Sequence, residues 1–259
     1  MRKIIFLDFD NTLYSHRTGR VPSSARKALE DLRSRGHFLV LATGRGLESR
    51  AMVDRETAIF FDAYIFLNGQ VVIENEQVVF EQHISLENTK RVFSLADSLG
   101  VAYGGFTCVG QALNRLTPHV QAVWDDFESD IPPILPGFRD IEKIYLLQLY
   151  IEESEEPLFQ DILNGYVTNR PHQYLLSLIP KNAGKSLGMN FLMDKHGFGK
   201  ADSYAFGDGY NDVDMLLCAG CGIAMADGNE KLKALADIVC PPADEDGIAR
   251  IIESLGLCT

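Results

Sequence analysis

A short apolar run that ends in two acidic residues opens the chain and constrains its fold more than any other feature. Residues 4–7 are Ile, Ile, Phe and Leu, which is typical of a strand buried on both faces of a parallel sheet. Asp8 and Asp10 follow, and in extended backbone residues two positions apart share one face. Such close carboxylates repel unless a cation or a shared proton lies between them. An ordinary polar turn after the strand could have the same sequence, so other motifs must show whether these residues form a functional site.

Two more apolar runs, residues 37–42 and 63–67, resemble the first, and helical patterns separate the three. The first expected helix begins with Ser23 or Ser24 as N-cap and ends at Gly36, and a shorter helix follows the second strand. Strands that alternate with helices over short links are typical of right-handed parallel crossovers. Polar and glycine residues follow each strand, and ligands bind at that edge of an open α/β sheet.

From about residue 70 the pattern changes to hairpin-like, glycine-rich and proline-rich stretches, and it returns to alternating helices and strands near residue 186. The sequence therefore predicts an α/β fold with a Rossmann-like parallel-sheet core domain and an inserted, smaller α+β domain. The expected bounds are residues 1–81 and 181–259 for the core and residues 82–180 for the insertion.

Composition argues against several classes of protein. The 259 residues have a net charge of -12, and nucleic-acid binding needs clustered Lys and Arg, so nucleic acid is not expected as a partner. No apolar run approaches the ~20 residues that span a bilayer, and Asp8 comes too early for the apolar core of a signal peptide. The five cysteines are irregularly spaced, which indicates free thiols in a reducing compartment. We therefore expect a cytoplasmic protein with no membrane partner.

A second acidic pair, Asp208 and Asp212, flanks a glycine-rich turn after the apolar residues 203–206. If that strand neighbours the first one, carboxylates meet at one edge, which is costly without a hard cation. Oxygen ligands without an adjacent His or Cys favour Mg²⁺ over zinc. Thr43 offers a hydroxyl and helix-start N–H groups to an anion, and Lys185 offers a positive charge. An anion held in this way is most simply a phosphate ester, which one Asp can attack while another serves as acid and then base.

Four motifs, taken in order, resemble those of a known superfamily. The motifs are residues 8–13 (DFDNTL), residues 43–45 (TGR), Lys185 and residues 207–212 (GDGYND). With them the chain resembles the haloacid dehalogenase superfamily, specifically its Cof-type phosphatases with a large cap of the C2 (IIB-like) type between the second and third motifs. The resemblance frames the whole chain. It implies that the core carries catalysis and that the cap closes over it, excludes water and sets substrate specificity.

The resemblance also implies roles for eight residues. The catalytic residues would be Asp8 as nucleophile, Asp10 as general acid and base, and Lys185. The phosphoryl group would be contacted by Thr43, Gly44, Lys185 and Asn211. The implied cofactor is Mg²⁺, bound by the side chain of Asp8, the backbone carbonyl of Asp10 and Asp208, with Asp212 at or just behind the metal.

These roles predict a Mg²⁺-dependent phosphatase that hydrolyses a small phosphate monoester, with a sugar phosphate as the expected class, through an aspartyl-phosphate intermediate. Its partner would be a small phosphorylated metabolite, and the sequence leaves the oligomeric state open. A phosphomutase or phosphotransferase of the same superfamily is an alternative, because the aspartyl phosphate can pass to a second hydroxyl. A non-catalytic phosphate-binding regulatory module is a further alternative, but its expected sign is the loss of Asp8 or Asp10, and both are present.

Two other motifs around Lys185 are rejected. Residues 184–188 (GKSLG) match the G-x-S-x-G nucleophile elbow, whose acid and histidine must follow the serine in that order. The only later histidine, His196, precedes Asp208, so we interpret the match as accidental. The same residues mimic the end of a Walker A loop, but Ile179 stands where that loop needs its first glycine.

Overall fold

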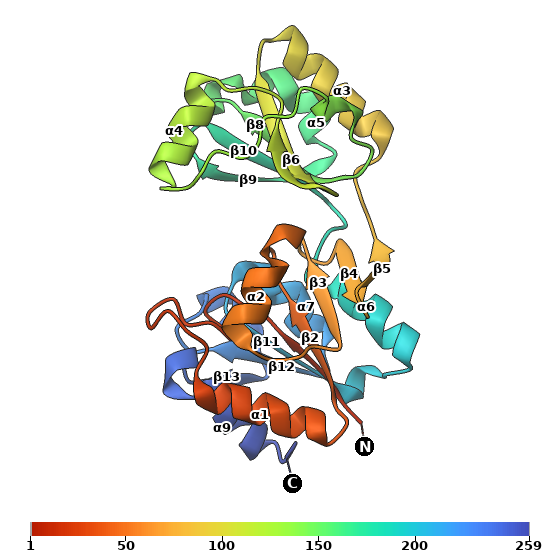
Figure 1. Ribbon diagram of the computed structural model, residues 1–259, viewed down its shortest axis with the longest axis vertical. Helices are drawn as coiled ribbons and strands as arrows, with labels where there is room; N and C mark the ends of the chain where they lie inside the picture. The colour runs from red at the N-terminus through yellow and green to blue at the C-terminus, as the bar shows by residue number, and fades with distance from the viewer. Residues whose placement is uncertain (1, 259) are drawn as a thin grey trace. The chain divides into compact units, whose positions relative to one another are not determined.

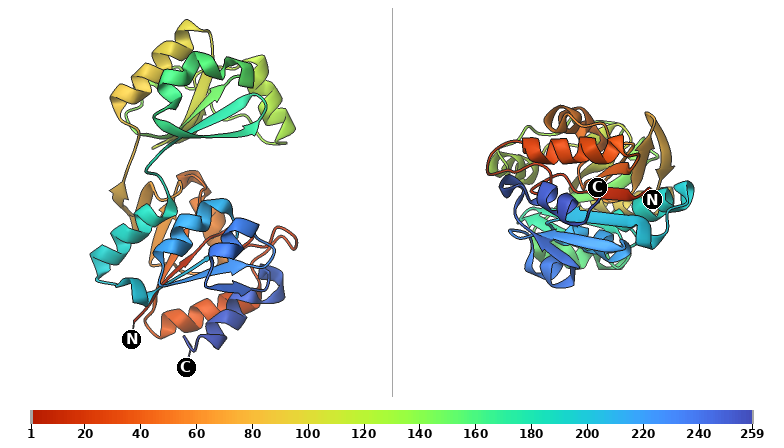
Figure 2. Two further views of the ribbon diagram at one scale, coloured as in Figure 1. Left: turned by 180° about the vertical axis from the view of Figure 1, so that it is seen from behind. Right: turned by 90° about the horizontal axis from the view of Figure 1, so that it is seen from below.

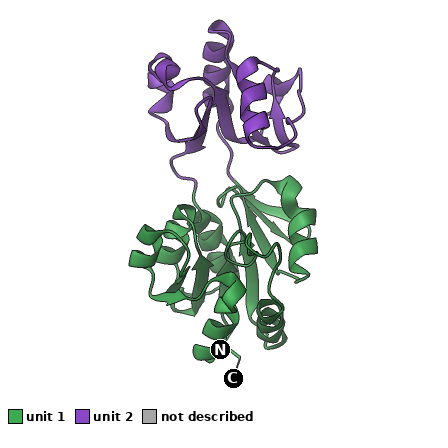
Figure 3. Ribbon diagram, turned by 90° about the vertical axis from the view of Figure 1, so that its left-hand side faces the viewer, with its two compact units in different colours: residues 1–81, 184–259 green, residues 82–183 purple. Residues whose placement is uncertain are grey.

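The chain divides into two compact units in its computed structural model, which describes residues 2–258 (Figure 3). The core unit comprises Met1–Glu81 and Gly184–Thr259, and the inserted unit comprises Gln82–Ala183. The core unit has a mainly parallel sheet, and the inserted unit has a separate antiparallel sheet. The predicted fold class is therefore confirmed. That the core unit carries catalysis and the inserted unit selects the substrate stays a prediction.

The core unit is built on an eight-stranded sheet in the order β13-β12-β11-β1-β2-β3-β4-β5 (Figure 1). The parallel strands are β1 (Ile4–Leu7), β2 (Phe38–Ala42), β3 (Ala63–Phe66), β11 (Ser203–Gly207), β12 (Cys221–Met225) and β13 (Ile238–Cys240). The strands β4 (Val71–Glu74) and β5 (Gln77–Glu81) extend one edge as an antiparallel hairpin. Strand β1 lies between β2 and β11, so segments from both ends of the chain meet at the centre of the sheet.

Helices cover both faces of the core sheet, which explains why its central strands are apolar along their whole length (Figure 2). Ile4 and Phe6 of β1 belong to one apolar cluster with side chains of α6, α7 and α8. The buried residues of α1 and α9 lie outside that cluster, and these two helices pack against each other. The helices of the core unit are α1 (Ser23–Ser34), α2 (Arg50–Thr57), α6 (Lys185–His196), α7 (Val213–Cys218), α8 (Glu230–Leu235) and α9 (Gly247–Ser254). Within residues 2–258 no helix is long and apolar enough to cross a membrane.

The inserted unit has a five-stranded antiparallel sheet in the order β7-β6-β8-β10-β9. Its elements are α3 (Leu86–Ser98), β6 (Ala102–Thr107), β7 (Gly110–Leu113), α4 (Pro118–Asp126), β8 (Ile144–Tyr150), α5 (Gln160–Leu163), β9 (Tyr166–His172) and β10 (Leu175–Pro180). Tyr103 and Leu149 share an apolar cluster with α3 and α5, whereas Ala102 and Tyr150 pack with α4. Because neighbours along a strand point to opposite faces, these helices cover the sheet from two sides.

The predicted N-cap of the first helix was wrong. Ser23 is the first residue of α1, Pro22 occupies the N-cap position, and no side-chain hydrogen bond caps the helix start. The hydroxyl of Ser24 instead donates to the carboxylate of Asp246, which lies at the start of α9. A proline before the helix fixes its own φ, here -59°, and this sets the entry of the chain without a polar cap.

Strand β9 had no counterpart in the sequence prediction. Most of its residues are polar or exposed, and it contains Pro171, which cannot donate to a sheet ladder. The strand lies at the edge of the inserted sheet, and among residues 2–258 its one partner strand is β10. An edge strand of this composition gives no alternating or continuous apolar signal, so nothing in its sequence separates it from a loop.

Gly69 joins the loop after β3 to the segment that carries Lys185, and this contact predicts an effect on stability. Its φ is +92°, which favours glycine, and a Cβ built on it would lie 1.8 Å from the backbone oxygen of Gly184. We expect Gly69→Ala to lower the free energy of unfolding by about 2–5 kcal/mol through backbone strain and overpacking together. In the control Gly36→Ala, φ is +82° but no atom lies within 4 Å of the new Cβ, so strain alone should cost about 1–2 kcal/mol. Urea unfolding compares the two variants, and equal losses would contradict the importance of the close approach.

Candidate active site

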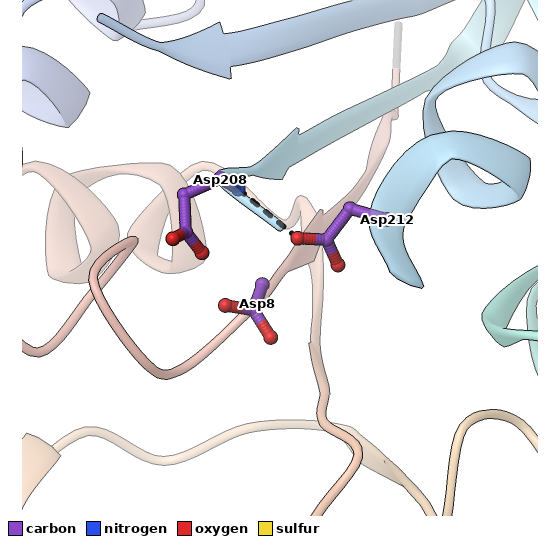
Figure 4. A group of neighbouring side chains, drawn as sticks. All are labelled: Asp8, Asp208 and Asp212. Atoms are coloured by element: carbon purple, nitrogen blue, oxygen red, sulfur yellow. Dashed lines mark hydrogen bonds between the residues drawn. The ribbon is translucent and has the colours of Figure 1, made fainter. Parts of the chain in front are cut away.

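Three aspartates meet at the carboxyl ends of two neighbouring strands of the core sheet (Figure 4). Asp8 follows β1 and Asp208 follows β11, and the two strands pair in parallel with Leu7 opposite Phe206. The N–H of Asp8 donates to the carbonyl of Phe206 at 3.0 Å, which extends the ladder by one residue. Asp212 comes from the turn after β11. One carboxylate oxygen of each aspartate lies within 4.8 Å of the others, so the structure brings these three predicted residues together.

The side chain of Lys185 lies between two of these carboxylates. Its Nζ is 2.5 Å from Oδ1 of Asp8 and 2.5 Å from Oδ1 of Asp212, and the lysine is 0% exposed. When all three aspartates are ionised, three negative charges therefore face one positive charge. Such an imbalance in a buried place is relieved by a further cation or by uptake of protons.

Burial and the neighbouring charges shift the pKa values of Asp8, Asp208 and Lys185. Burial raises the pKa of Asp8 well above its ordinary value and the charge of Asp212 adds to the shift, although Lys185 opposes it. Burial and the charge of Asp212 raise the pKa of Asp208 to about 6. Burial alone would lower the pKa of Lys185, but the charges of Asp212 and Asp8 raise it. Lys185 therefore stays charged, and added positive charge would favour the ionised forms of Asp8 and Asp208.

Asp212 holds the loop that carries Asp208. Its Oδ1 accepts a hydrogen bond from Lys185, and its Oδ2 accepts from the backbone N–H groups of Asp208 at 3.0 Å and Gly209 at 2.9 Å. The carboxylate of Asp208 accepts a longer hydrogen bond, at 3.4 Å, from the hydroxyl of Thr12. Asp212 thus holds the loop with Oδ2 and Lys185 with Oδ1, whereas Asp208 keeps more capacity to bind a ligand.

The start of α6 positions Lys185, and Asp214 holds that helix start in place. Lys185 is the first residue of α6, and the N–H of Ser186 donates to Oδ2 of Asp214 at 2.7 Å. A Cβ on Gly184 would collide with the same carboxylate, so a glycine permits this approach. Sequence reasoning missed Asp214, because nothing in the sequence indicates that the start of α7 meets the start of α6.

Asn68 joins two predicted phosphoryl-binding residues, Gly44 and Asn211. The side-chain amide of Asn211 donates to Oδ1 of Asn68 at 3.1 Å, and a Cβ on Gly44 would lie 2.9 Å from the same oxygen. Thr43 precedes Gly44, is buried, and donates its N–H to the carbonyl of Ile65 at 2.8 Å. Asn68 was not among the predicted site residues, although it follows β3 at the edge where the other strands carry theirs.

The side chain of Asp10 is held by a different set of residues. Its Oδ2 accepts from Nε of Arg45 and its Oδ1 from Nη2 of Arg45, both at 2.7 Å, and Oδ1 also lies 2.8 Å from Nε2 of His16. Burial by itself would raise the pKa of Asp10, but the hydrogen bonds and charge of Arg45, with His16, lower it. The two carboxylates of the first motif therefore have opposite shifts. No role was predicted for Arg45 or His16, and the one available signal was that Arg45 is the last residue of the second motif, residues 43–45.

The raised pKa of Asp208 predicts how the stability of the metal-free protein depends on pH. The ordinary pKa is 3.8 and the folded value is about 6, so in this window the folded protein binds more protons than the unfolded chain and loses stability as the pH rises. Asp208→Asn removes this titration. In the presence of a chelator we expect the variant to unfold at a higher temperature than the parent above about pH 6, and the difference to vanish near about pH 4.

Thermal unfolding of parent and variant across this pH range measures the difference, with Asp31→Asn as the matched control because Asp31 is exposed on α1. A difference that is constant with pH, or a variant that is less stable at neutral pH, would contradict the assigned electrostatic cost.

Comparisons with known proteins agree with this geometry. A family model of haloacid dehalogenase-like hydrolases matches residues 5–252. YkrA of Bacillus subtilis (strain 168), named as a candidate phosphatase, is 30% identical over 261 residues, which cover 98% of each chain. The structure of BT1666 from Bacteroides thetaiotaomicron, described as a phosphatase of the HAD superfamily, has a TM-score of 0.86 at 29% identity and covers 99% of this chain and 96% of its own. BT4131, described as a HAD subclass IIB sugar phosphatase, has a TM-score of 0.77 at 28% identity and covers 98% of this chain and 99% of its own.

The family match spans nearly the whole chain and includes all four motifs. The relatives resemble the chain over both its units, and they are described as phosphatases. The aspartates and the buried lysine that the core unit brings together occupy the first, third and fourth of those motifs. The chain therefore belongs to the haloacid dehalogenase-like hydrolases and is a phosphomonoester hydrolase of that superfamily.

Proposed function

We propose that the chain is a Mg²⁺-dependent phosphatase that hydrolyses a small phosphate monoester, with sugar phosphates as the substrate class, through a phosphoryl intermediate on Asp8. The observation that carries this proposal is the arrangement of three aspartates around the buried ammonium of Lys185. This group has more carboxylates than its lysine can balance. A phosphate ester, itself an anion, would bind beside it only together with a cation.

The donor set fits Mg²⁺. Among the described residues, the group that could hold a metal ion consists of three carboxylates, whose hard oxygens suit Mg²⁺ better than zinc. We assign the side chains of Asp8 and Asp208 and the backbone carbonyl of Asp10 as ligands, with Asp212 at or just behind the metal. When bound, the ion would supply positive charge that offsets the carboxylates and the phosphoryl oxygens. The raised pKa values of Asp8 and Asp208 support this assignment, because these carboxylates need added positive charge to stay ionised.

In the first half-reaction a carboxylate oxygen of Asp8 attacks the phosphorus. Lys185 donates to Oδ1 of Asp8, which leaves Oδ2 for the attack. The bond from Asp8 to phosphorus forms, the bond from phosphorus to the leaving oxygen breaks, and that oxygen takes a proton from Asp10. Arg45 lowers the pKa of Asp10 in the free protein, and the negative charge of the bound phosphoryl group favours the protonated form that this step requires. The residues that we assign to the phosphoryl oxygens are Thr43, Gly44, Lys185 and Asn211.

In the second half-reaction a water molecule attacks the phosphorus. Asp10 takes the proton of the water as general base, and the bond from phosphorus to Asp8 breaks. The proton that Asp10 now holds is available to the next leaving group. One ester and one water are consumed in each cycle, and both aspartates return to their starting states.

The substrate class rests on a relative and on the polarity of the inserted unit. BT4131, which is 28% identical, is described as a sugar phosphatase. In the inserted unit the buried side chains of Gln148 and Ser177 stand opposite each other on β8 and β10, and Gln111 donates to Gln148 at 3.2 Å. Amides and hydroxyls of this kind are suitable partners for the hydroxyl groups of a sugar.

Phosphate release from a panel of esters tests the proposed activity. The panel contains hexose, pentose, nucleotide and simple alkyl phosphates, each with Mg²⁺ and again with a chelator. We expect sugar phosphates to be hydrolysed fastest and the chelator to lower the rates by about 100-fold or more. Preference for nucleotides would contradict the substrate class. Consumption of a sugar phosphate without phosphate release would contradict hydrolysis and favour a mutase or a phosphotransferase.

Replacement of the nucleophile tests the covalent mechanism. Asp8→Asn keeps the size of the side chain but removes the attacking oxygen anion, so we expect kcat to fall by about 1,000-fold or more with the fold retained. Asp31→Asn, an exposed substitution of the same type on α1, should keep the kcat of the parent. Steady-state kinetics and thermal unfolding of both variants measure these effects. Activity of Asp8→Asn near that of the parent would show that Asp8 is not the nucleophile.

A further inference from the structure

The guanidinium of Arg45 forms a bidentate pair of hydrogen bonds with the carboxylate of Asp10. Nε of Arg45 donates to Oδ2 and Nη2 donates to Oδ1, each at 2.7 Å. Because the guanidinium and the carboxylate are both planar, the two hydrogen bonds fix both the position and the rotation of the acid. A single hydrogen bond would not do so.

Arg45 is itself held firmly at the carboxyl end of β2. Its N–H donates to Oγ1 of Thr43 at 3.1 Å, and its carbonyl accepts from the N–H of Leu67 at 3.0 Å. Its guanidinium also lies 5.4 Å from the ring centroid of Phe9, the buried residue between Asp8 and Asp10. Arg45 thus connects the ends of β1, β2 and β3, and its backbone is fixed on two sides.

Asp10 also belongs to a closed circuit of side-chain contacts. Nε2 of His16 lies 2.8 Å from Oδ1 of Asp10, and the His16 ring meets Tyr14 edge-on at 5.2 Å. Tyr14 stacks on Phe9 at 5.4 Å, and Phe9 lies under Arg45. The contacts therefore run from Asp10 through Arg45, Phe9, Tyr14 and His16 back to Asp10.

This arrangement leaves a defined place for proton transfer. The two oxygens of a carboxylate offer about four positions for accepted hydrogen bonds. In Asp10 the neighbouring side chains fill two positions on Oδ1 and one on Oδ2. The remaining position on Oδ2 is the one that can hold a proton without loss of these contacts.

We propose that Arg45 is a positioning residue that holds Asp10 in the orientation in which Oδ2 gives its proton to the leaving oxygen and later takes one from the attacking water. The inference rests on the proposed function, in which Asp10 is the general acid and base. In the first transfer the bond from hydrogen to Oδ2 breaks as the leaving oxygen gains that hydrogen. In the second, Oδ2 regains a hydrogen from the water, so the balance over a cycle is closed.

The ion pair between Arg45 and Asp10 contributes too little to the stability of the fold for stabilisation to be its main role. The side chains of Arg45 and Asp10 are 36% and 32% exposed, and ion pairs at such positions contribute little to stability. A backbone fixed on two sides, a forked contact and a supporting aromatic ring are more than a surface ion pair needs. A general acid needs such support, because a small displacement from the reacting atom lowers the reaction rate strongly.

The nature of the leaving group separates this role from a structural one. An alkoxide leaving group needs a proton, whereas p-nitrophenolate leaves readily without one, so a misplaced acid slows alkyl esters selectively. The ratio kcat/KM reports the steps up to phosphoryl transfer to Asp8 and is insensitive to the later attack of water. We expect Arg45→Met to lower kcat/KM for a sugar or glycerol phosphate by about 100-fold and for p-nitrophenyl phosphate by less than about 5-fold.

Two further variants sharpen the experiment. Arg45→Lys keeps the charge but not the fork, so it should show the same selective loss, and it serves if Arg45→Met does not fold. Asp10→Ala removes the acid itself, and in that background Arg45→Met should have no further selective effect, because its role acts through Asp10.

Arg50→Met is the matched control. Arg50 pairs with Asp54 and Glu76, and its guanidinium lies 3.8 Å from the ring centroid of Tyr64. Arg50→Met should leave the ratio of the two kcat/KM values within about 2-fold of that of the parent, because the ion pairs of Arg50 with Asp54 and Glu76 are structural.

Three results would overturn the inference. Equal losses for both esters would mean that Arg45 binds the phosphoryl group or the substrate directly. A gain with the alkyl ester would mean that Arg45 holds Asp10 back. A selective loss that persists in the Asp10→Ala background would mean that Arg45 does not act through Asp10. Failure of the proposed function looks different, because the parent protein would then release phosphate from neither ester.

Discussion

The site depends on one buried contact, the ammonium of Lys185 between the carboxylates of Asp8 and Asp212. Lys185 is 177 positions from Asp8 in the sequence, so the contact forms only when both parts of the core unit have come together. It allows carboxylates to be buried side by side, which would otherwise be very costly. It also leaves them in excess, since Asp208 adds a further charge that the lysine cannot balance. The same contact thus stabilises the site and prepares it to bind a cation together with an anionic ester.

The strand order of the core sheet explains how this site is assembled. Strands β11, β1, β2 and β3 are successive neighbours and run parallel, so the residues after them gather at one edge. Each strand contributes a different chemical group. Asp208 and Asp8 supply carboxylates, Thr43 supplies a hydroxyl, and Asn68 supplies an amide that meets Asn211. The insertion of Gln82–Ala183 leaves this edge intact, because it enters after the β4–β5 hairpin and ends directly before α6.

Much of this could be predicted from the sequence, since apolar runs followed by polar residues mark the strands and their carboxyl ends. The fold class and the family were predicted correctly, and the structure brings Asp8, Asp208, Asp212 and Lys185 together. The roles of these residues in catalysis stay predictions. The sequence did not show which distant side chains would contact one another in the folded protein. Arg45 could as well have bound the substrate, and neither Asn68 nor Asp214 belongs to a recognisable motif. Similarly, β9 was missed because an edge strand has no apolar pattern to recognise.

Detection of a phosphoryl group on Asp8 is the most direct test of the covalent mechanism. Asp10→Asn should slow the attack of water on the intermediate, and p-nitrophenyl phosphate should still transfer its phosphoryl group because its leaving group needs no acid. The variant is mixed with Mg²⁺ and this ester and quenched in acid, and its peptides are analysed by mass spectrometry. We expect one phosphoryl group on the peptide that contains Asp8, and none when Asp8 is also replaced by Asn. Release of p-nitrophenol without a phosphorylated Asp8, or with a phosphoryl group on another residue, would contradict the covalent mechanism.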